Sequence, residues 1–110
     1  MLKGDIYLAS LTRKKGSVQT GTRPVIIIQN NTGNQFSPTT IICPITTARK
    51  KHIPTHCRLR KDGGLRRFST ALCEQIVTIP KTDLKRYIGT VKNKRTLKQL
   101  DRCIKCSLGL

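Results

Sequence analysis

The hydrophobic positions along the chain fall into short segments. Residues 25–28 (Val-Ile-Ile-Ile) form the longest apolar run, and turn-forming residues bound it on both sides. A β-branched run this short is typical of a strand buried on both faces. Residues 55–60 instead alternate polar and apolar side chains, which predicts a strand whose solvated face carries arginines. Similar short segments predict further strands at residues 5–10, 39–45, 70–79 and 88–91.

Polar, glycine-containing segments separate these strands. Residues 11–22 and 30–38 are expected to be exposed connections, and Asp62-Gly63-Gly64 is a strong turn signal. Residues 81–86 are expected to form a helical turn after Pro80 ends the preceding strand.

Only residues 93–108 show helical periodicity. Their apolar positions recur three or four residues apart, at Leu97, Leu100, Cys103, Ile104 and Leu108. Asn93 is the expected N-cap, and Gly109 the expected stop. Five or six strands followed by one helix, without a βαβ rhythm, predict a mainly β fold with a C-terminal helix, curled into a small sheet or barrel.

The charge points to a polyanionic partner. The 110 residues fit a single domain, 1–110, and carry 22 Lys and Arg against 5 Asp and Glu, a net charge of +17. Nucleic acid is the first candidate, before an acidic protein or an anionic membrane surface. The densest basic block spans residues 49–70, where these charges could line one concave face.

Other features of the sequence bear on the cellular compartment of the protein. No apolar run approaches the roughly 20 residues of a membrane-spanning helix, and the N-terminus does not resemble a signal peptide. Five scattered cysteines do not resemble a disulfide framework, so we expect a reduced, cytoplasmic protein that does not associate with membranes.

Two constellations resemble metal or redox motifs. His52 and His56 are separated by Pro54, which disfavours a helix, and an extended strand would hold them roughly 13 Å apart. Cys103 and Cys106 form a CxxC near the wrong end of a helix for a thioredoxin-type site. We interpret the histidines as unrelated and the cysteines as packing residues, and we expect no metal or other cofactor.

The scarcity of carboxylates limits the possible chemistry. A two-metal nuclease holds its ions with several carboxylates, which five acidic residues can scarcely supply. A nuclease built from this chain should therefore work without metal. RNA suits that mechanism, because its own 2′-hydroxyl can attack the adjacent phosphorus.

Several sequence blocks closely resemble the MazF/PemK family of toxin endoribonucleases. They fall in order along nearly the whole chain, at residues 4–8, 16–30, 33–39, 44–46, 54–56, 72–79 and 107–110. The resemblance implies an SH3-like β-barrel of the plasmid-maintenance-toxin (MazF/Kid/PemK) type that forms a homodimer. It also implies metal-independent, sequence-specific cleavage of single-stranded RNA, leaving 2′,3′-cyclic phosphate and 5′-hydroxyl ends, and neutralisation by an acidic antitoxin.

The same resemblance implies site residues. The family's catalytic Arg and Thr fall on Arg23 and Thr46, and we expect Arg23 to bind the phosphorane charge, because guanidinium keeps its proton. The residues expected to contact RNA are Lys15, Gly16, Ser17, Gln19, Thr47, Arg49, His56, Glu74 and Gln75.

One departure from the family leaves alternatives open. Val18 stands where relatives commonly have a Glu that could accept the 2′-hydroxyl proton. Either another group, such as His56, takes this role, or the protein is slower or differently specific. The alternatives are an RNA-binding barrel that has lost cleavage and, less in keeping with the sequence, a zinc or redox module on Cys103 and Cys106.

Overall fold

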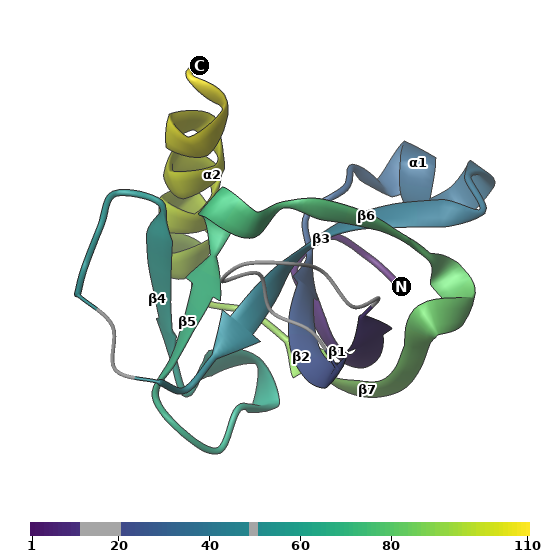
Figure 1. Cartoon of the computed structure of the whole chain (residues 1–110), viewed down its shortest axis with the longest axis horizontal. Coiled ribbons are helices and arrows are strands. Elements are labelled where there is room, and N and C mark those ends of the chain that lie inside the picture. The colour runs from purple at the N-terminus through teal and green to yellow at the C-terminus, as the bar shows by residue number, and fades with distance from the viewer. Residues whose placement is uncertain (12–20, 49–50) are drawn as a thin grey trace.

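A computed structural model describes residues 1–11, 21–48 and 51–110 (Figure 1). The predicted class, mainly β with a C-terminal helix, is confirmed. In chain order the elements are β1 Asp5–Leu11, β2 Gly21–Ile27, α1 Asn31–Phe36, β3 Thr39–Thr46, β4 His56–Arg60, η1 Asp62–Gly64, β5 Ser69–Leu72, η2 Cys73–Gln75, β6 Val77–Pro80, η3 Lys81–Asp83, β7 Leu84–Thr90 and α2 Lys94–Leu108.

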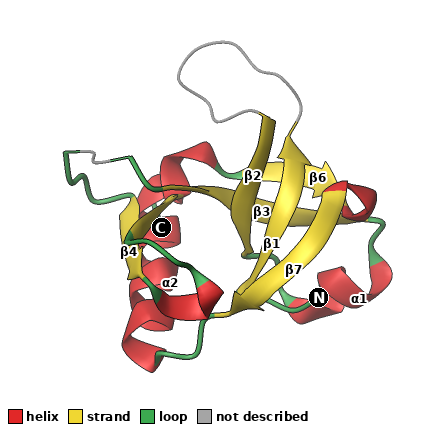
Figure 2. Cartoon of the chain, turned by 90° about the horizontal axis from the view of Figure 1, so that it is seen from below, coloured by secondary structure: helices red, strands yellow, loops and turns green. Residues whose placement is uncertain are grey.

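Strand β3 organises the sheet. Hydrogen-bonded strands follow the order β4-β5-β3-β2-β1-β7, with every pairing antiparallel. One edge of β3 pairs with β2, while the other pairs first with β6 and then with β5. The sheet curls strongly (Figure 2), but pairing in the described part of the chain does not close it into a complete barrel.

A glycine contact bridges the two edges of the sheet. The η1 turn follows β4 and packs against β7. A Cβ placed on Gly89 of β7 would lie only 2.3 Å from the Gly63 carbonyl oxygen, so the backbones touch directly. Gly63 also has a φ of 68°, which glycine adopts without strain. We call this contact the glycine seam.

Strand β2 lies between two apolar clusters. Ile26 packs in a cluster with Cys43, Ile45 and Leu100, whereas Val25 and Ile27 pack in a second cluster with Ile42, Ile79 and Ala9. Val25, Ile26 and Ile27 are all fully buried. The prediction that this run is a strand buried on both faces is therefore confirmed for residues 25–27, whereas Ile28 is partly buried and follows the end of β2.

Helix α2 matches its predicted limits. The Asn93 side chain accepts hydrogen bonds from the N–H groups of Arg95 and Thr96, and Gly109 ends the helix in the left-handed conformation. Leu100 and Cys103 are buried where α2 packs against β4 and η2. No helix in residues 1–11, 21–48 and 51–110 is long and apolar enough to span a membrane.

Three sequence expectations are wrong. Of the helical turn expected over residues 81–86, only Lys81–Asp83 is helical (η3), because residues 84–86 already pair with β1 as part of β7. Residues 30–38 contain the short helix α1, whose Asn34 is buried and accepts hydrogen bonds from Thr40 Oγ1 (2.8 Å) and Gln29 Nε2 (3.1 Å). The single strand expected over residues 70–79 is split by η2 into β5 and β6, which pair with different halves of β3. At η2 the chain therefore passes from the half of β3 that pairs with β5 to the half that pairs with β6.

Candidate nucleic-acid interface

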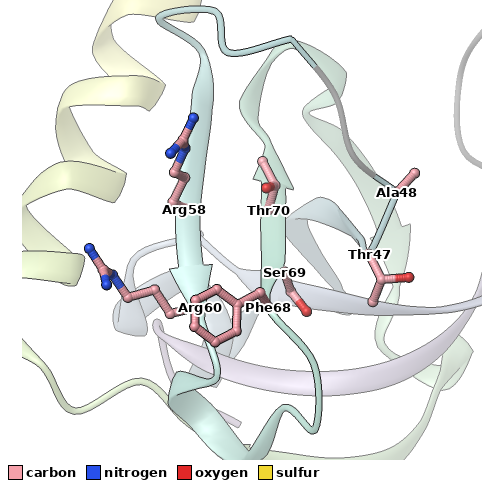
Figure 3. Close-up of a pocket in the computed structure, with 7 residues that line it drawn as sticks. All are labelled: Thr47, Ala48, Arg58, Arg60, Phe68, Ser69 and Thr70. Atoms are coloured by element: carbon pink, nitrogen blue, oxygen red, sulfur yellow. The ribbon is translucent and has the colours of Figure 1, made fainter.

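An open cleft lies where β3, β4 and β5 meet. It has a volume of about 550 Å³ and is shown in Figure 3. Two arginines extend from β4, and residues at the ends of β3 and β5 line the remaining walls. The lining residues are Thr47, Ala48, Arg58, Arg60, Phe68, Ser69 and Thr70.

Strand register explains which side chains reach this face. Cys57, Ala71 and Ile45 lie opposite one another across β4, β5 and β3, and all three are buried in the first apolar cluster. Since neighbouring residues of a strand point to opposite faces, the next positions must point away from that cluster. Those positions are Arg58, Thr70 and Thr46, which are likewise paired across the strands.

The same register brings Arg23 toward Thr46. The β2–β3 pairing runs from Ile27–Ile42 to Val25–Pro44. The ladder ends at Val25–Pro44, so Arg23 and Thr46 each lie two residues beyond its last pair, at the same end of β2 and β3. Arg58, Thr70 and Thr46 form one line across three strands, which we call the cross-strand row, and Arg23 lies on β2, at the opposite edge of β3 from β5.

Thr46 is held firmly at the end of β3. Its side chain is almost buried, and its Oγ1 accepts a hydrogen bond from the Ala48 N–H at 3.1 Å. Arg23 is half-buried on β2. The two residues expected to be catalytic thus lie at the same end of β2 and β3, while Thr47 is exposed and lines the cleft.

The cleft is positively charged and lacks local neutralisation. Arg58 and Arg60 are exposed, and neither forms an ion pair with any residue in the described ranges. Within those ranges, no carboxylate lines the cleft. Most acidic side chains form hydrogen bonds elsewhere, Asp5 with the Leu2 N–H and Thr90, and Asp62 with the Gly63 N–H. The local field therefore favours an anion.

His56 and Glu74 form a pair at the other end of β4. His56 Nε2 lies 3.0 Å from Glu74 Oε2, and Thr55 Oγ1 donates to Glu74 Oε1 at 3.2 Å. The His56 side chain is only 6% exposed, against 34% for Glu74. Glu74 can therefore be reached from solvent, whereas the imidazole lies behind it and is poorly placed to act on RNA directly.

The other expected RNA contacts divide into two groups. Gln75 is half-buried in η2 beside Glu74, away from the cleft lining. The remaining candidates lie outside the described residues, namely Lys15, Gly16, Ser17, Gln19 and Arg49.

Four cysteines are buried in the first apolar cluster, whereas Cys106 is exposed, and all five are free. Burial, together with the nearby Cys103 thiol, raises the pKa of the Cys57 thiol. A hydrogen bond with Cys43, together with burial, raises the pKa of Cys73. Among the described residues, no three His, Cys, Asp or Glu side chains are arranged to hold a metal ion. The interpretation of Cys103 as a packing residue is confirmed, whereas it is wrong for Cys106, whose position on α2 leaves it exposed.

Sequence reasoning missed part of the cleft. Alternation in residues 55–60 identified the exposed arginines, but it did not place Phe68 beside them. It also gave no sign of the bulge between β4 and β5, where Arg60 adopts a left-handed φ of 57°. Phe68 follows two arginines in a segment without periodicity, so its position depends on the fold.

Comparisons with known proteins agree with one another. Residues 2–108 match the family model of PemK-like, MazF-like toxins of type II toxin–antitoxin systems. The chain is also 45% identical over 112 residues to an endoribonuclease MazF of Staphylococcus saprophyticus, a match that covers all of this chain and 92% of the relative.

Solved structures share the same fold. An endoribonuclease from a mycobacterial species, solved in complex with its cognate antitoxin, superposes with a TM-score of 0.84 at 25% identity, over 100% of this chain and 96% of that one. A MazF from Deinococcus radiodurans superposes with a TM-score of 0.82 at 18% identity, over 100% and 97% of the two chains.

Proposed function

Because the chain belongs to the family of PemK-like and MazF-like toxins of type II toxin–antitoxin systems, we propose that it is a toxin that cuts single-stranded RNA without a metal ion. The position of Arg23 and Thr46 at the same end of β2 and β3, each two residues beyond the last β2–β3 pair, is the observation that supports these two residues as the catalytic pair. RNA is the expected substrate because the relative from Staphylococcus saprophyticus is named an endoribonuclease.

The reaction uses the substrate's own nucleophile. The 2′-oxygen of the ribose bonds to the adjacent phosphorus while the bond from phosphorus to the 5′-oxygen breaks. The 2′-hydroxyl proton leaves to a base, and the 5′-oxygen gains a proton. The products are a 2′,3′-cyclic phosphate and a 5′-hydroxyl, so no water molecule is consumed in this step.

Arg23 and Thr46 stabilise the charge that develops at phosphorus. The Arg23 guanidinium offers several N–H donors in one plane, which suits two phosphate oxygens at once. Thr46 Oγ1 already accepts from the Ala48 N–H, so its hydroxyl proton remains available to donate to phosphate or to the leaving oxygen. Arg23 does not serve as the base, because guanidinium retains its proton at neutral pH.

The proposal includes three properties of the intact system. An acidic antitoxin competes with RNA for the cationic face, as the antitoxin complex of the mycobacterial relative suggests. The toxin acts as a homodimer with RNA along the dimer interface. It works in the cytoplasm, whose reducing conditions keep its five free cysteines as thiols.

The test combines cleavage, end groups and one substitution. The protein is incubated with a long single-stranded RNA transcript in excess EDTA, and the products are analysed for cyclic phosphate and 5′-hydroxyl ends. Arg23→Ala should lower cleavage by at least 100-fold, since it removes a transition-state contact. Arg102→Ala is the matched control, because this exposed arginine lies on α2, on the other side of β4.

Further results distinguish a metal-free ribonuclease from an RNA-binding module and from a metal-dependent nuclease. A substrate with a 2′-deoxyribose at the mapped cut site should resist the parent enzyme, because the nucleophile is missing. Tight RNA binding without cutting, across many sequences, would contradict the proposal and favour a binding module. Cleavage that stops in EDTA and returns with a divalent cation would contradict the metal-free mechanism.

A further inference from the structure

The cleft residues Arg58, Arg60 and Phe68 have no role in the proposed reaction. We propose that they form a nucleotide subsite, which binds the phosphate and base of an RNA nucleotide that flanks the cleaved bond. This inference rests on the proposed function for the identity of the polymer. It adds a recognition site outside the catalytic pair, and it predicts a preference at one flanking position.

The cross-strand row gives the subsite its distance from the catalytic pair. Arg58 lies two strand spacings, roughly 10 Å, from Thr46, and Arg23 lies on β2, at the opposite edge of β3 from β5. At this separation the two arginines serve different phosphates. Thr70 and Thr46 lie between them, so hydroxyl groups face the stretch of RNA that joins those phosphates.

Arg60 lines the same cleft from a strained backbone conformation. It is the only non-glycine residue with a positive φ in the described part of the chain, at 57°. It sits at a register shift, where Arg58 pairs with Thr70 but Arg60 pairs with Ser69. Bulges often redirect a side chain beside a functional site, and such strain persists where the surrounding structure maintains it.

Phe68 supplies a surface for a base. Its side chain is 66% exposed, and Lys61 Nζ lies 5.7 Å from the ring centroid. Figure 3 shows the ring beside the carbon stem of Arg60, whose guanidinium points away from the ring, so Lys61 supplies the cation beside a base stacked there. Aromatic stacking combined with phosphate-binding cations is the usual means of binding single-stranded nucleic acid.

An RNA nucleotide fits this combination better than an acidic peptide does. Carboxylates of a peptide would engage Arg58 and Arg60 but leave the exposed Phe68 ring without a flat partner. A nucleotide satisfies the cations through phosphate and the ring through its base.

Binding rather than cleavage tests this inference. Affinities are measured by fluorescence anisotropy with a 12-nucleotide single-stranded RNA centred on a mapped cut site, or oligo(A) where no cut is found. The Arg23→Ala protein serves as the background, so that the RNA stays intact. The variants are Arg58→Gln, Arg60→Asn, which tolerates the left-handed backbone, and Phe68→Leu, with Arg102→Gln as the matched control.

Arg58→Gln and Phe68→Leu should each weaken binding about tenfold. Arg58→Gln should also lower the slope of log affinity against log salt by about 0.7, as expected for one lost phosphate contact on a single strand. When the bases are replaced one at a time by abasic sites, one position should abolish the Phe68→Leu effect, because the stacking partner is then missing.

Effects within twofold of Arg102→Gln would overturn the subsite. So would a Phe68→Leu effect that persists at every abasic position, or variants that weaken binding to an oligo-glutamate peptide but not to RNA. The outcomes also separate this inference from the proposed function. A protein that cuts RNA while these variants bind normally fails only here, whereas one that binds through the subsite but never cuts fails only the proposed function.

Discussion

Strand β4 presents two faces with opposite physical character. On one face Cys57 and Leu59 are 0% and 1% exposed and pack against α2. On the other face Arg58 and Arg60 are exposed and line the cleft. The residues alternate one by one, so a shift of one position would bury two guanidinium groups and expose the thiol.

The difference shows that stability depends mainly on one face of β4 and ligand recognition on the other. The core face excludes water and keeps its groups neutral, whereas the cleft face concentrates positive charge and tolerates strain at Arg60. Substitutions on the core face should therefore change the free energy of unfolding and spare RNA affinity in the folded protein. Substitutions on the cleft face should do the reverse.

The largest effect is expected from Leu59→Ala on the core face. Removing this buried side chain should lower the free energy of unfolding by about 3 kcal/mol, through lost burial and the cavity left behind. Urea denaturation measures the change, and anisotropy in buffer should show unchanged RNA affinity for the folded fraction. A loss below about 1 kcal/mol would mean that this face is not a tightly packed core.

The second effect is a dependence on alkaline pH. The raised pKa values of Cys57 and Cys73 keep both thiols protonated in the folded protein, while unfolded thiols ionise near pH 9. Stability should be unaffected by these thiols below that pH and should fall above it, by about 1.4 kcal/mol per pH unit for each thiol.

Urea denaturation between pH 8 and 10, under reducing conditions, measures this slope. Cys57→Ala and Cys73→Ala should each flatten it, whereas Cys106→Ala should not, because Cys106 is exposed. An equal slope in all three variants would assign the pH dependence to other groups.

A smaller effect of opposite sign is expected from Arg60→Gly on the cleft face. Glycine relieves the left-handed strain but adds freedom to the unfolded chain, so stability should rise by about 0.5–1 kcal/mol. Thermal and urea unfolding measure the gain, and RNA affinity should fall in the same variant. A destabilised Arg60→Gly would show that the arginine side chain supports the fold.

The smallest effect on stability is expected from Arg58→Gln. This exposed side chain forms no ion pair among the described residues, so the free energy of unfolding should change by less than about 0.5 kcal/mol. Reduced self-repulsion in a chain of net charge +17 would make any change favourable. A clear destabilisation would remove the distinction between the two faces.

Local patterns predicted the fold where burial and periodicity coincide. The buried run at residues 25–28 and the helix with its Asn93 cap were predicted largely correctly, because the sequence pattern that predicts each of them lies within a short segment of the chain. Helix α1 was missed because its polar sequence is organised by Asn34, whose hydrogen-bond partners Gln29 and Thr40 lie outside the helix. The break at η2 depends on which half of β3 each strand joins, and no local pattern carries that information.

The site was predictable to a similar extent. Arg23 and Thr46 were proposed through family resemblance, and the β2–β3 pairing leaves both at the same end of their strands. The exposed arginines followed from alternation, but the cleft also needs Phe68 and the bulge at Arg60, which arise from how β4 meets β5. Long-range strand pairing, rather than composition, assembles this surface.

The glycine seam has a consequence for local opening. It joins β7 to the turn after β4 through backbone contact, without a ladder of hydrogen bonds between the two edge strands. Separating that seam breaks fewer interactions than separating β2 from β3 at the centre of the sheet. In hydrogen–deuterium exchange, the outward-facing amides of the edge strands should therefore exchange long before those of β2 and β3. The molecule would then open locally at the glycine seam while β2 and β3 stay paired.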